Sequence, residues 1–338
     1  MTIDHLPADA PLDEQIAWVN GHVKALRGAI GEIIVGQTDV VEGAIIGLFA
    51  GGHVLLEGVP GVGKTMLVRA LASAVSLPFS RVQFTPDLMP TDIIGTHVLV
   101  TDDKGGRSFT FRQGPIFTSI LLADEINRAT PKTQSALLEA MQESRVTVGR
   151  DTFQLDAPFF VIATQNPLEM EGTYPLPEAQ LDRFMFKLHV PFPSREDLHA
   201  IVQRTVVVNE STIESVMGGV DILAVRRIAI GCPIAHHVVD YAIRLVEGTH
   251  GSLGPARQYL RTGASPRAVQ ALIVGAKLGA IFDGRANASI DDIRKLALPV
   301  LRHRVQLNFD AEADGIATDH VIENLLGEVD KAAGTDRK

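Results

Sequence analysis

Residues 58–65 read Gly58-Val59-Pro60-Gly61-Val62-Gly63-Lys64-Thr65 and match the pattern G-x-x-x-x-G-K-[ST] at every fixed position. The run from His53 to Glu57 before this stretch has the character of a buried strand, and the pattern from Met66 to Val75 is that of a helix. A strand, a glycine-rich loop and a helix in this order are the context of a phosphate-binding loop. The stretch therefore predicts an α/β domain.

The residue types in this loop suit a triphosphate and its metal ion. Glycines let backbone N–H groups turn toward phosphate oxygens, Lys64 adds positive charge at the β and γ phosphates, and Thr65 offers a hydroxyl to Mg²⁺. The alternative is an ordinary glycine-rich turn, which would not require the flanking strand and helix. We therefore expect ATP and Mg²⁺ as cofactors. The loop residues expected to bind the nucleotide are Gly58, Pro60, Gly61, Val62, Gly63, Lys64, Thr65 and Met66.

Two carboxylates follow a second apolar run, Ile120 to Ala123. Because parallel sheets hold their ligands at the carboxyl ends of strands, Asp124 is expected near the metal, which it would hold through water together with Thr65. Glu125 could orient and deprotonate the water that attacks the γ-phosphate. Two acidic residues alone would more often form a turn or a helix cap, and the preceding phosphate loop favours the catalytic interpretation.

A third apolar run, Phe159 to Ala163, is followed by Thr164-Gln165-Asn166-Pro167. This order puts the amide of Asn166 beside the same ligand edge, where it could contact the γ-phosphate or the attacking water. Asn-Pro by itself is a turn signal, so the assignment depends on the other residues of the site.

Buried runs of this kind alternate with helical stretches and predict a parallel sheet covered by helices. Two pairs of strands break the alternation and predict β-hairpins. The first hairpin joins His97–Val100 to Arg107–Phe111, and the second joins Arg145–Val148 to Thr152–Leu155. After Pro191-Phe192-Pro193 the runs become helical, which predicts a second, smaller domain. The predicted segments are a disordered start at 1–11, an α/β nucleotide-binding domain at 12–195, a linker at 196–220, a helical domain at 221–330 and a flexible tail at 331–338.

Composition limits the classes of function. The chain has 338 residues and a formal net charge of -9, which argues against duplex nucleic acid as the main partner because phosphate neutralisation needs a dense basic surface. One cysteine allows no internal disulfide framework, and no apolar run approaches the length of a membrane span. No secretion leader opens the sequence, so we expect a cytoplasmic protein.

Together these motifs resemble the AAA+ ATPases and, within them, the MoxR family, from about Gly31 to Glu328. The phosphate loop corresponds to the Walker A motif, and Asp124-Glu125 ends the Walker B motif. The resemblance implies a five-stranded parallel AAA+ sheet covered by helices, with two β-hairpin inserts, followed by a small all-α lid domain. Further matching segments are 34–37, 122–129, 140–143, 163–167, 176–184 and 263–268.

The resemblance also implies roles for single residues. Asn166 corresponds to sensor 1, Arg267 to sensor 2 and Arg183 to the arginine finger, while Gly36 and Gln37 resemble the segment beside the adenine. Arg183 would reach the γ-phosphate of a neighbouring subunit, and Arg267 would bind the nucleotide of its own subunit.

Alternatives remain for both arginines. Arg183 could be a salt-bridged partner of Asp182, and Arg267 could be a helix-start residue. Arg128 lies close to the carboxylates in sequence and could share the finger's task.

The family resemblance implies the activity of an ATP hydrolase, which converts ATP and water to ADP and phosphate. The motor would be a homo-hexamer that remodels protein clients, or matures metal or cofactor enzymes, with a von Willebrand factor A domain protein as partner. The first hairpin matches the family's helix-2 insert, and the second matches its pre-sensor-1 hairpin. The resemblance implies that both face the pore of the ring or its rim. A nucleic-acid-stimulated motor and a slow ATP-dependent assembly switch are the alternatives.

Overall fold

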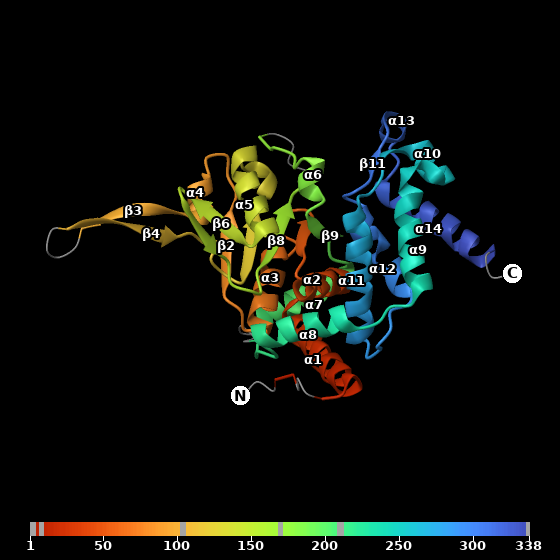
Figure 1. Ribbon diagram of the computed structural model, residues 1–338, viewed down its shortest axis with the longest axis horizontal. Coiled ribbons are helices and arrows are strands. Elements are labelled where there is room, and N and C mark those ends of the chain that lie inside the picture. The colour runs from red at the N-terminus through yellow and green to blue at the C-terminus, as the bar shows by residue number, and fades with distance from the viewer. Residues whose placement is uncertain (1–4, 7–9, 102–105, 168–171, 208–212, 336–338) are drawn as a thin grey trace.

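A five-stranded parallel sheet with strand order β2-β5-β8-β1-β9 forms the centre of the protein (Figure 1). The computed structural model describes residues 5–6, 10–101, 106–167, 172–207 and 213–335, so most of the predicted disordered start, 1–11, lies outside the described residues. The strands are β1 (His53–Glu57), β2 (Phe79–Gln83), β5 (Ile120–Asp124), β8 (Phe160–Gln165) and β9 (Phe184–His189). The sheet confirms the predicted fold class.

The strands in the middle of the sheet are buried on both faces. Every residue of β5 is buried, as are the first four residues of β1, because helices cover both sides of a parallel sheet. The edge strand β2 instead has only Val82 buried, and its remaining side chains are accessible to solvent to different degrees. The apolar runs in the sequence therefore mark the central strands more clearly than the edge strand.

The two predicted hairpins are present. β3 (Gly95–Thr101) pairs with β4 (Arg107–Gln113) and projects from the body of the molecule (Figure 1), while β6 (Arg145–Val148) pairs with β7 (Asp151–Gln154). Gly95 has a φ of +95°, and a Cβ there would lie 2.3 Å from the carbonyl oxygen of Arg112, so the first hairpin requires glycine at its base. Residues 102–105, between the two strands of the first hairpin, lie outside the described residues.

Helices surround the sheet, and the first two pack their apolar sides inward. In α1 the five buried residues, Ile16, Val19, Val23, Leu26 and Ile30, recur with helical spacing. The helices of this part are α1 (Leu12–Ile33), α2 (Thr38–Ala50), α3 (Lys64–Ala74), α4 (Pro90–Ile94), η1 (Ile126–Arg128), α5 (Pro131–Glu143), α6 (Glu178–Leu181) and α7 (Arg195–Val207). Most of α7 and the start of the next helix occupy the predicted linker, 196–220, where exposed side chains left little periodicity to recognise.

The C-terminal part is mainly helical, but it also contains a short antiparallel pair, β10 (Leu260–Thr262) and β11 (Gln306–Leu307), that the sequence did not predict. Strands of two or three residues are too short to produce a readable alternation. The helices are α8 (Gly219–Gly231), α9 (His236–Glu247), η2 (Gly248–Ser252), α10 (Gly254–Tyr259), α11 (Pro266–Phe282), α12 (Ile290–Leu301), α13 (Phe309–Ala313) and α14 (Thr318–Thr335). α14 extends into the predicted tail, 331–338; the exact domain boundaries stay a prediction.

One apolar core joins the two parts of the molecule. α11 contacts α1, α2 and β9, and the rings of Phe49 and Phe282 meet edge to face with centroids 5.3 Å apart. The guanidinium of Arg226 on α8 donates to the carbonyl oxygens of Leu48 and Phe49, at 3.1 and 3.0 Å, where α2 ends. The helical part is therefore fixed against the sheet by buried contacts.

No single helix within the described residues is long and apolar enough to cross a membrane. The segments 219–231 and 236–252 pass that test only as a pair, and they are bent by 97° relative to each other.

Candidate nucleotide-binding site

The predicted nucleotide-binding and catalytic groups of the sheet meet at one edge. β5, β8 and β1 are neighbouring parallel strands, so their carboxyl ends lie side by side. Asp124 ends β5, Asn166 follows β8, and Gly58 follows β1 with its N–H donating to the carbonyl of Gln165 at 3.3 Å. Asn166 is only 4% exposed. The structure thus brings together three motifs that are separated in the sequence.

The glycine loop has the backbone that its sequence requires. Gly61 and Gly63 have φ angles of +82° and +87°, in the left-handed region that favours glycine. α3 begins at Lys64, so the N–H groups of its first turn adjoin the loop, and Thr65 and the exposed Met66 belong to that turn. The Lys64 ammonium folds over the loop and donates to the carbonyl oxygens of Gly58 and Val59. Phosphate oxygens would compete with these carbonyl oxygens for the Lys64 ammonium.

Asp124 is held through both carboxylate oxygens. Its Oδ1 accepts a 2.6 Å hydrogen bond from the hydroxyl of Thr164. Its Oδ2 accepts two hydrogen bonds from Arg81 on β2, from Nε at 3.0 Å and Nη2 at 2.6 Å. Thr164 in turn accepts the backbone N–H of Glu125 at 2.8 Å, and Glu125 has a left-handed φ of +56°. The end of β5 is therefore rigidly positioned.

The carboxylate of Glu125 also has defined partners. Its Oε2 accepts the side-chain amide of Gln83 at 2.7 Å and Nη1 of Arg128 at 3.0 Å. Sequence reasoning did not identify Gln83 or Arg81. Their spacing of two along β2 places both side chains on one face of that strand, but nothing in the sequence revealed that β2 is the neighbour of β5. Arg128 pairs with the glutamate of its own chain.

Gly36 and Gln37 form a tight turn beside the loop. Both have left-handed φ angles, and a Cβ on Gly36 would lie 2.8 Å from a carboxylate oxygen of Asp197 on α7. The Gln37 amide donates to the carbonyl of Val62 at 2.9 Å, while its Oε1 is buried without a partner among the described residues. A buried acceptor next to the phosphate loop fits an amino group such as that of adenine.

The strand before the loop ends in an ionised carboxylate. Glu57 contacts Lys187 Nζ at 2.8 Å and His189 Nε2 at 3.2 Å, both on β9. Burial would raise the pKa of Glu57, but the hydrogen bonds and charges of His189 and Lys187 outweigh burial and lower the pKa to about 2. His189 Nδ1 also lies 4.0 Å from Asp319 on α14, which links this edge to the helical part.

Arg183 and Arg267 lie at the opposite end of the strands, where β1 and β9 begin. β9 runs parallel to β1, with Phe184 beside His53 and His189 beside Glu57, so Arg183 stands where β1 begins. Arg267 lies with Arg183 at a cavity of about 280 Å³. The full lining is Ala50, Gly51, Gly52, Asp182, Arg183, Met185, Arg267, Gln270, Ala271, Val274 and Arg304.

Asp182 organises the positive charges around this cavity. It accepts from Nε of the buried Arg304 at 2.9 Å and from the hydroxyl of Ser265, and it lies 3.6 Å from Nη1 of Arg267. Burial lowers the pKa of Arg304 to about 10, although Asp182 acts to raise it. Arg183 forms no side-chain hydrogen bond or ion pair with the described residues. The expected contact of Arg267 with the nucleotide of its own subunit does not fit this arrangement, because the length of β1 separates Arg267 from the loop.

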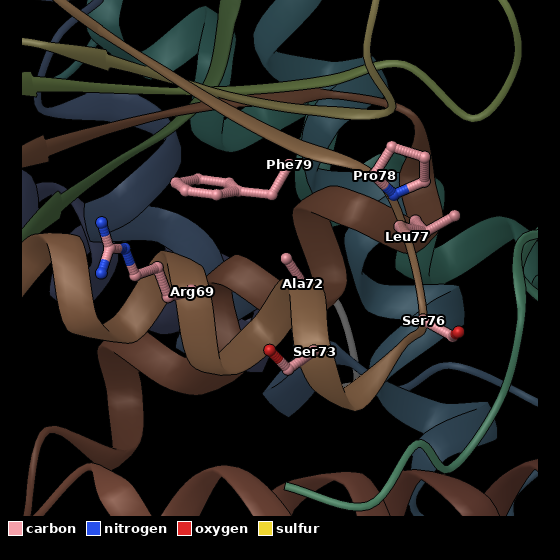
Figure 2. Close-up of a pocket in the computed structure, with 7 residues that line it drawn as sticks. All are labelled: Arg69, Ala72, Ser73, Ser76, Leu77, Pro78 and Phe79. Atoms are coloured by element: carbon pink, nitrogen blue, oxygen red, sulfur yellow. The ribbon is translucent and has the colours of Figure 1, made fainter. Parts of the chain in front are cut away.

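A further hollow of about 660 Å³ lies away from the ligand edge, between the end of α3 and the start of β2. Figure 2 shows its lining residues, Arg69, Ala72, Ser73, Ser76, Leu77, Pro78 and Phe79. It lies where the sheet's strands begin, so it has no direct access to the loop or to Asp124.

No cluster of three or more His, Cys, Asp or Glu side chains in the described part of the chain forms a metal site by itself. A magnesium ion would therefore depend on Thr65, Asp124 and the nucleotide's own phosphates. Carboxylate, hydroxyl and phosphate oxygens are the donors that Mg²⁺ prefers, so the residues present fit this ion.

Comparisons with known proteins agree with the fold. The family described as "ATPase family associated with various cellular activities (AAA)" matches residues 53–186, and the "AAA lid domain" matches residues 256–325. The first match extends from the start of β1 into β9 and includes the phosphate loop, Asp124 and Asn166.

Relatives cover nearly the whole chain. Chaperone MoxR1 of Mycobacterium tuberculosis is 45% identical over 90% of this chain and 81% of its own length. Protein MoxR of Methylorubrum extorquens is 32% identical over 89% of this chain and 91% of its own. A crystal structure of a candidate ATPase from Cytophaga hutchinsonii is 41% identical with a TM-score of 0.86, covering 93% of this chain and 96% of the other. The chain therefore belongs to the MoxR family of AAA+ ATPases.

Proposed function

We propose that this protein binds Mg-ATP at the ends of β1, β5 and β8 and hydrolyses it to ADP and phosphate. The observation that carries the proposal is the meeting of the glycine loop, the Asp124–Glu125 pair and Asn166 at one sheet edge. The buried Oε1 of Gln37, which has no hydrogen-bond partner in the part of the chain that the structure describes, supports adenine as the base. Family membership supports ATP as the substrate.

Each residue of the site has a chemical task in this proposal. Lys64 and the loop amides bind the β and γ phosphates, and Thr65 and Asp124 hold Mg²⁺. When bound there, Mg²⁺ would supply positive charge to the phosphate oxygens. Glu125 takes a proton from the attacking water, and Asn166 orients that water or the γ-phosphate.

We also propose that Arg183 and Arg267 act together on the nucleotide of a neighbouring subunit. Their position at the edge opposite the loop of their own chain supports a shared site. Head-to-tail contacts that close on themselves form a ring, in the family's manner a homo-hexamer. Each arginine would stabilise negative charge that develops during phosphoryl transfer.

The proposed work is chaperone-like remodelling of protein clients, or maturation of metal or cofactor enzymes, in the cytoplasm. The relative named Chaperone MoxR1 supports the first class, and the family resemblance suggests a von Willebrand factor A domain protein as partner. The net charge of -9 disfavours nucleic acid as the driven substrate.

A second candidate is a slow ATP-dependent assembly switch. It is favoured by the two donors, Gln83 and Arg128, that engage Glu125 Oε2, because a base held in this way must be released before it accepts a proton.

The substitution Glu125→Gln tests the hydrolytic function. We expect ATP affinity within about twofold of the wild type and a turnover lowered by roughly 100-fold or more, because the base is lost while the phosphate contacts remain. Calorimetric titration with ATP and a phosphate-release assay measure the two quantities. The exposed Glu139 of α5, changed to Gln, is the matched control. Turnover unchanged by Glu125→Gln would contradict the assignment, and a wild-type rate already near zero would favour the switch.

A further inference from the structure

Arg81 makes a two-donor contact with the carboxylate assigned to the metal. Its Nε and Nη2 both donate to Oδ2 of Asp124, at 3.0 and 2.6 Å. Arg81 is paired with Leu122 in the register between β2 and β5, two residues before Asp124. The guanidinium therefore reaches forward along the strand direction to the ligand edge of the sheet.

The two partners differ in their exposure to solvent. The side chain of Asp124 is 11% exposed, whereas that of Arg81 is 42% exposed. A carboxylate with so little exposure is costly to bury without a countercharge, and Arg81 supplies one. The arginine head can in turn move into water at little cost, because much of it is already solvated. Oδ1 of Asp124 stays fixed by the hydroxyl of Thr164.

A magnesium ion and the Arg81 guanidinium would compete for the same carboxylate. Both are cations, and their mutual repulsion at short range in a partly buried site is large compared with that in bulk water. We propose that Arg81 is an exchangeable counter-ion of Asp124, which leaves the carboxylate when Mg²⁺ and nucleotide load and thereby sets the Mg²⁺ affinity of the site. This inference rests on the proposed function.

Arg81 also connects the metal carboxylate to the proposed base. Nη2 of Arg81 donates to Oε1 of Gln83 at 2.8 Å, and the Gln83 amide donates to Glu125 at 2.7 Å. The same Nη2 of Arg81 thus contacts both Asp124 and Gln83.

The substitution Arg81→Met tests the exchange, because Met keeps an unbranched apolar stem and removes the guanidinium with its charge and donors. Binding of a nonhydrolysable ATP analogue is measured by calorimetry across a series of Mg²⁺ concentrations and in EDTA. Free Mn²⁺ is followed by electron paramagnetic resonance in parallel titrations with the analogue. We expect the half-saturating concentrations of Mg²⁺ and Mn²⁺ to fall about fivefold, as for loss of a competing ion pair of about 1 kcal/mol. Affinity in EDTA should stay within about twofold of the wild type.

Two further variants complete the test. Arg81→Lys retains the charge and should give a half-saturating metal concentration closer to the wild type, while the exposed Arg227 of α8, changed to Met, should have no effect. A raised half-saturating concentration in Arg81→Met would overturn the proposal by making Arg81 a support for the metal. A weaker affinity in EDTA would overturn it in favour of a phosphate contact. Failure of the wild type to bind the analogue at all would instead refute the proposed function.

Discussion

His53, the first residue of β1, is held as a neutral ring. It is 7% exposed, its Nδ1 accepts the N–H of Val161, and its Nε2 donates to the carbonyl of Met141, both at 3.0 Å. Burial lowers the pKa of His53 to about 4, although the hydrogen bond to Met141 acts to raise it. This one side chain connects β1 to β8 and to the end of α5.

We expect His53 to make the protein less stable in mild acid. The unfolded ring, with its ordinary pKa of 6.5, binds a proton that the folded ring with a pKa of about 4 rejects. The stability is therefore complete above the unfolded pKa and is lost as the pH falls toward the folded one, by about 2 kcal/mol between about pH 7 and about pH 5. Urea unfolding at both pH values measures the loss. His53→Gln retains a donor and an acceptor but does not titrate, so its free energy of unfolding should fall by about 2 kcal/mol less over the same pH range. Equal losses in both proteins would contradict the expectation.

At the scale of elements, the two hairpins are joined to each other by aromatic rings. Phe111 of β4 stacks on Phe153 of β7 with centroids 3.9 Å apart and planes inclined by 12°, and Phe117 meets both rings at their edges. His97 of β3 also lies 3.2 Å from the carboxylate of Asp151. The outer part of the first hairpin has no such cover, since Phe109 is 73% exposed.

We expect Phe153→Ala to release β6–β7 from the first hairpin. Loss of an aromatic pair worth about 1 kcal/mol, together with its buried area, should speed amide exchange in β6 and β7 by roughly tenfold. Hydrogen exchange read by mass spectrometry measures this rate. Phe109→Ala removes the same ring from an exposed position and should leave exchange in β6 and β7 unchanged. Equal effects of the two substitutions would show that the stack does not join the hairpins.

The sequence predicted the elements whose signal is local. The bounds of β1 were predicted to the residue, because its apolar run from His53 to Glu57 stops at a glycine. β9 was not identified as a strand from its own residues. That the sheet has five strands followed only from the family resemblance. The α7 helix and the β10–β11 pair were also missed, since their exposed or very short segments produce no period.

The candidate site divides in the same way. Asp124, Glu125 and Asn166 could be predicted to meet because ends of parallel strands share an edge. Arg81 and Gln83 could not, since their contacts depend on which strand lies beside β5. The place of Arg267 depends on how the helical part packs on the sheet, which no local pattern records.

At the scale of the whole molecule, the phosphate loop lies where β1 ends, and the Arg183–Arg267 pair lies at the opposite end of the sheet, where β1 begins. A single chain therefore presents the two halves of the proposed site in different directions. Complete sites would arise only between subunits, each chain supplying the loop of one site and the arginines of the next.

Mixing two inactive proteins tests this division. Glu125→Gln and Arg183→Ala subunits combined in equal amounts should regain turnover, with about a quarter of the sites intact if subunits mix at random. Arg267→Ala mixed with Glu125→Gln should behave alike, because its defect would also lie in the neighbour's site. A phosphate-release assay measures the recovery, and Glu125→Gln mixed with Lys64→Ala is the control that forms no intact site. Recovery with Arg183→Ala but none with Arg267→Ala would show that Arg267 acts on the nucleotide of its own subunit.

The apolar seam between α11 and the first two helices limits how this protein can be divided. A fragment ending before α8 would leave one side of Phe49 bare to water, together with the aliphatic surface around it. A chimera that takes its C-terminal part from a relative would for the same reason need the relative's α1 and α2 as well. The side chains of these two helices pack against α11 of that part.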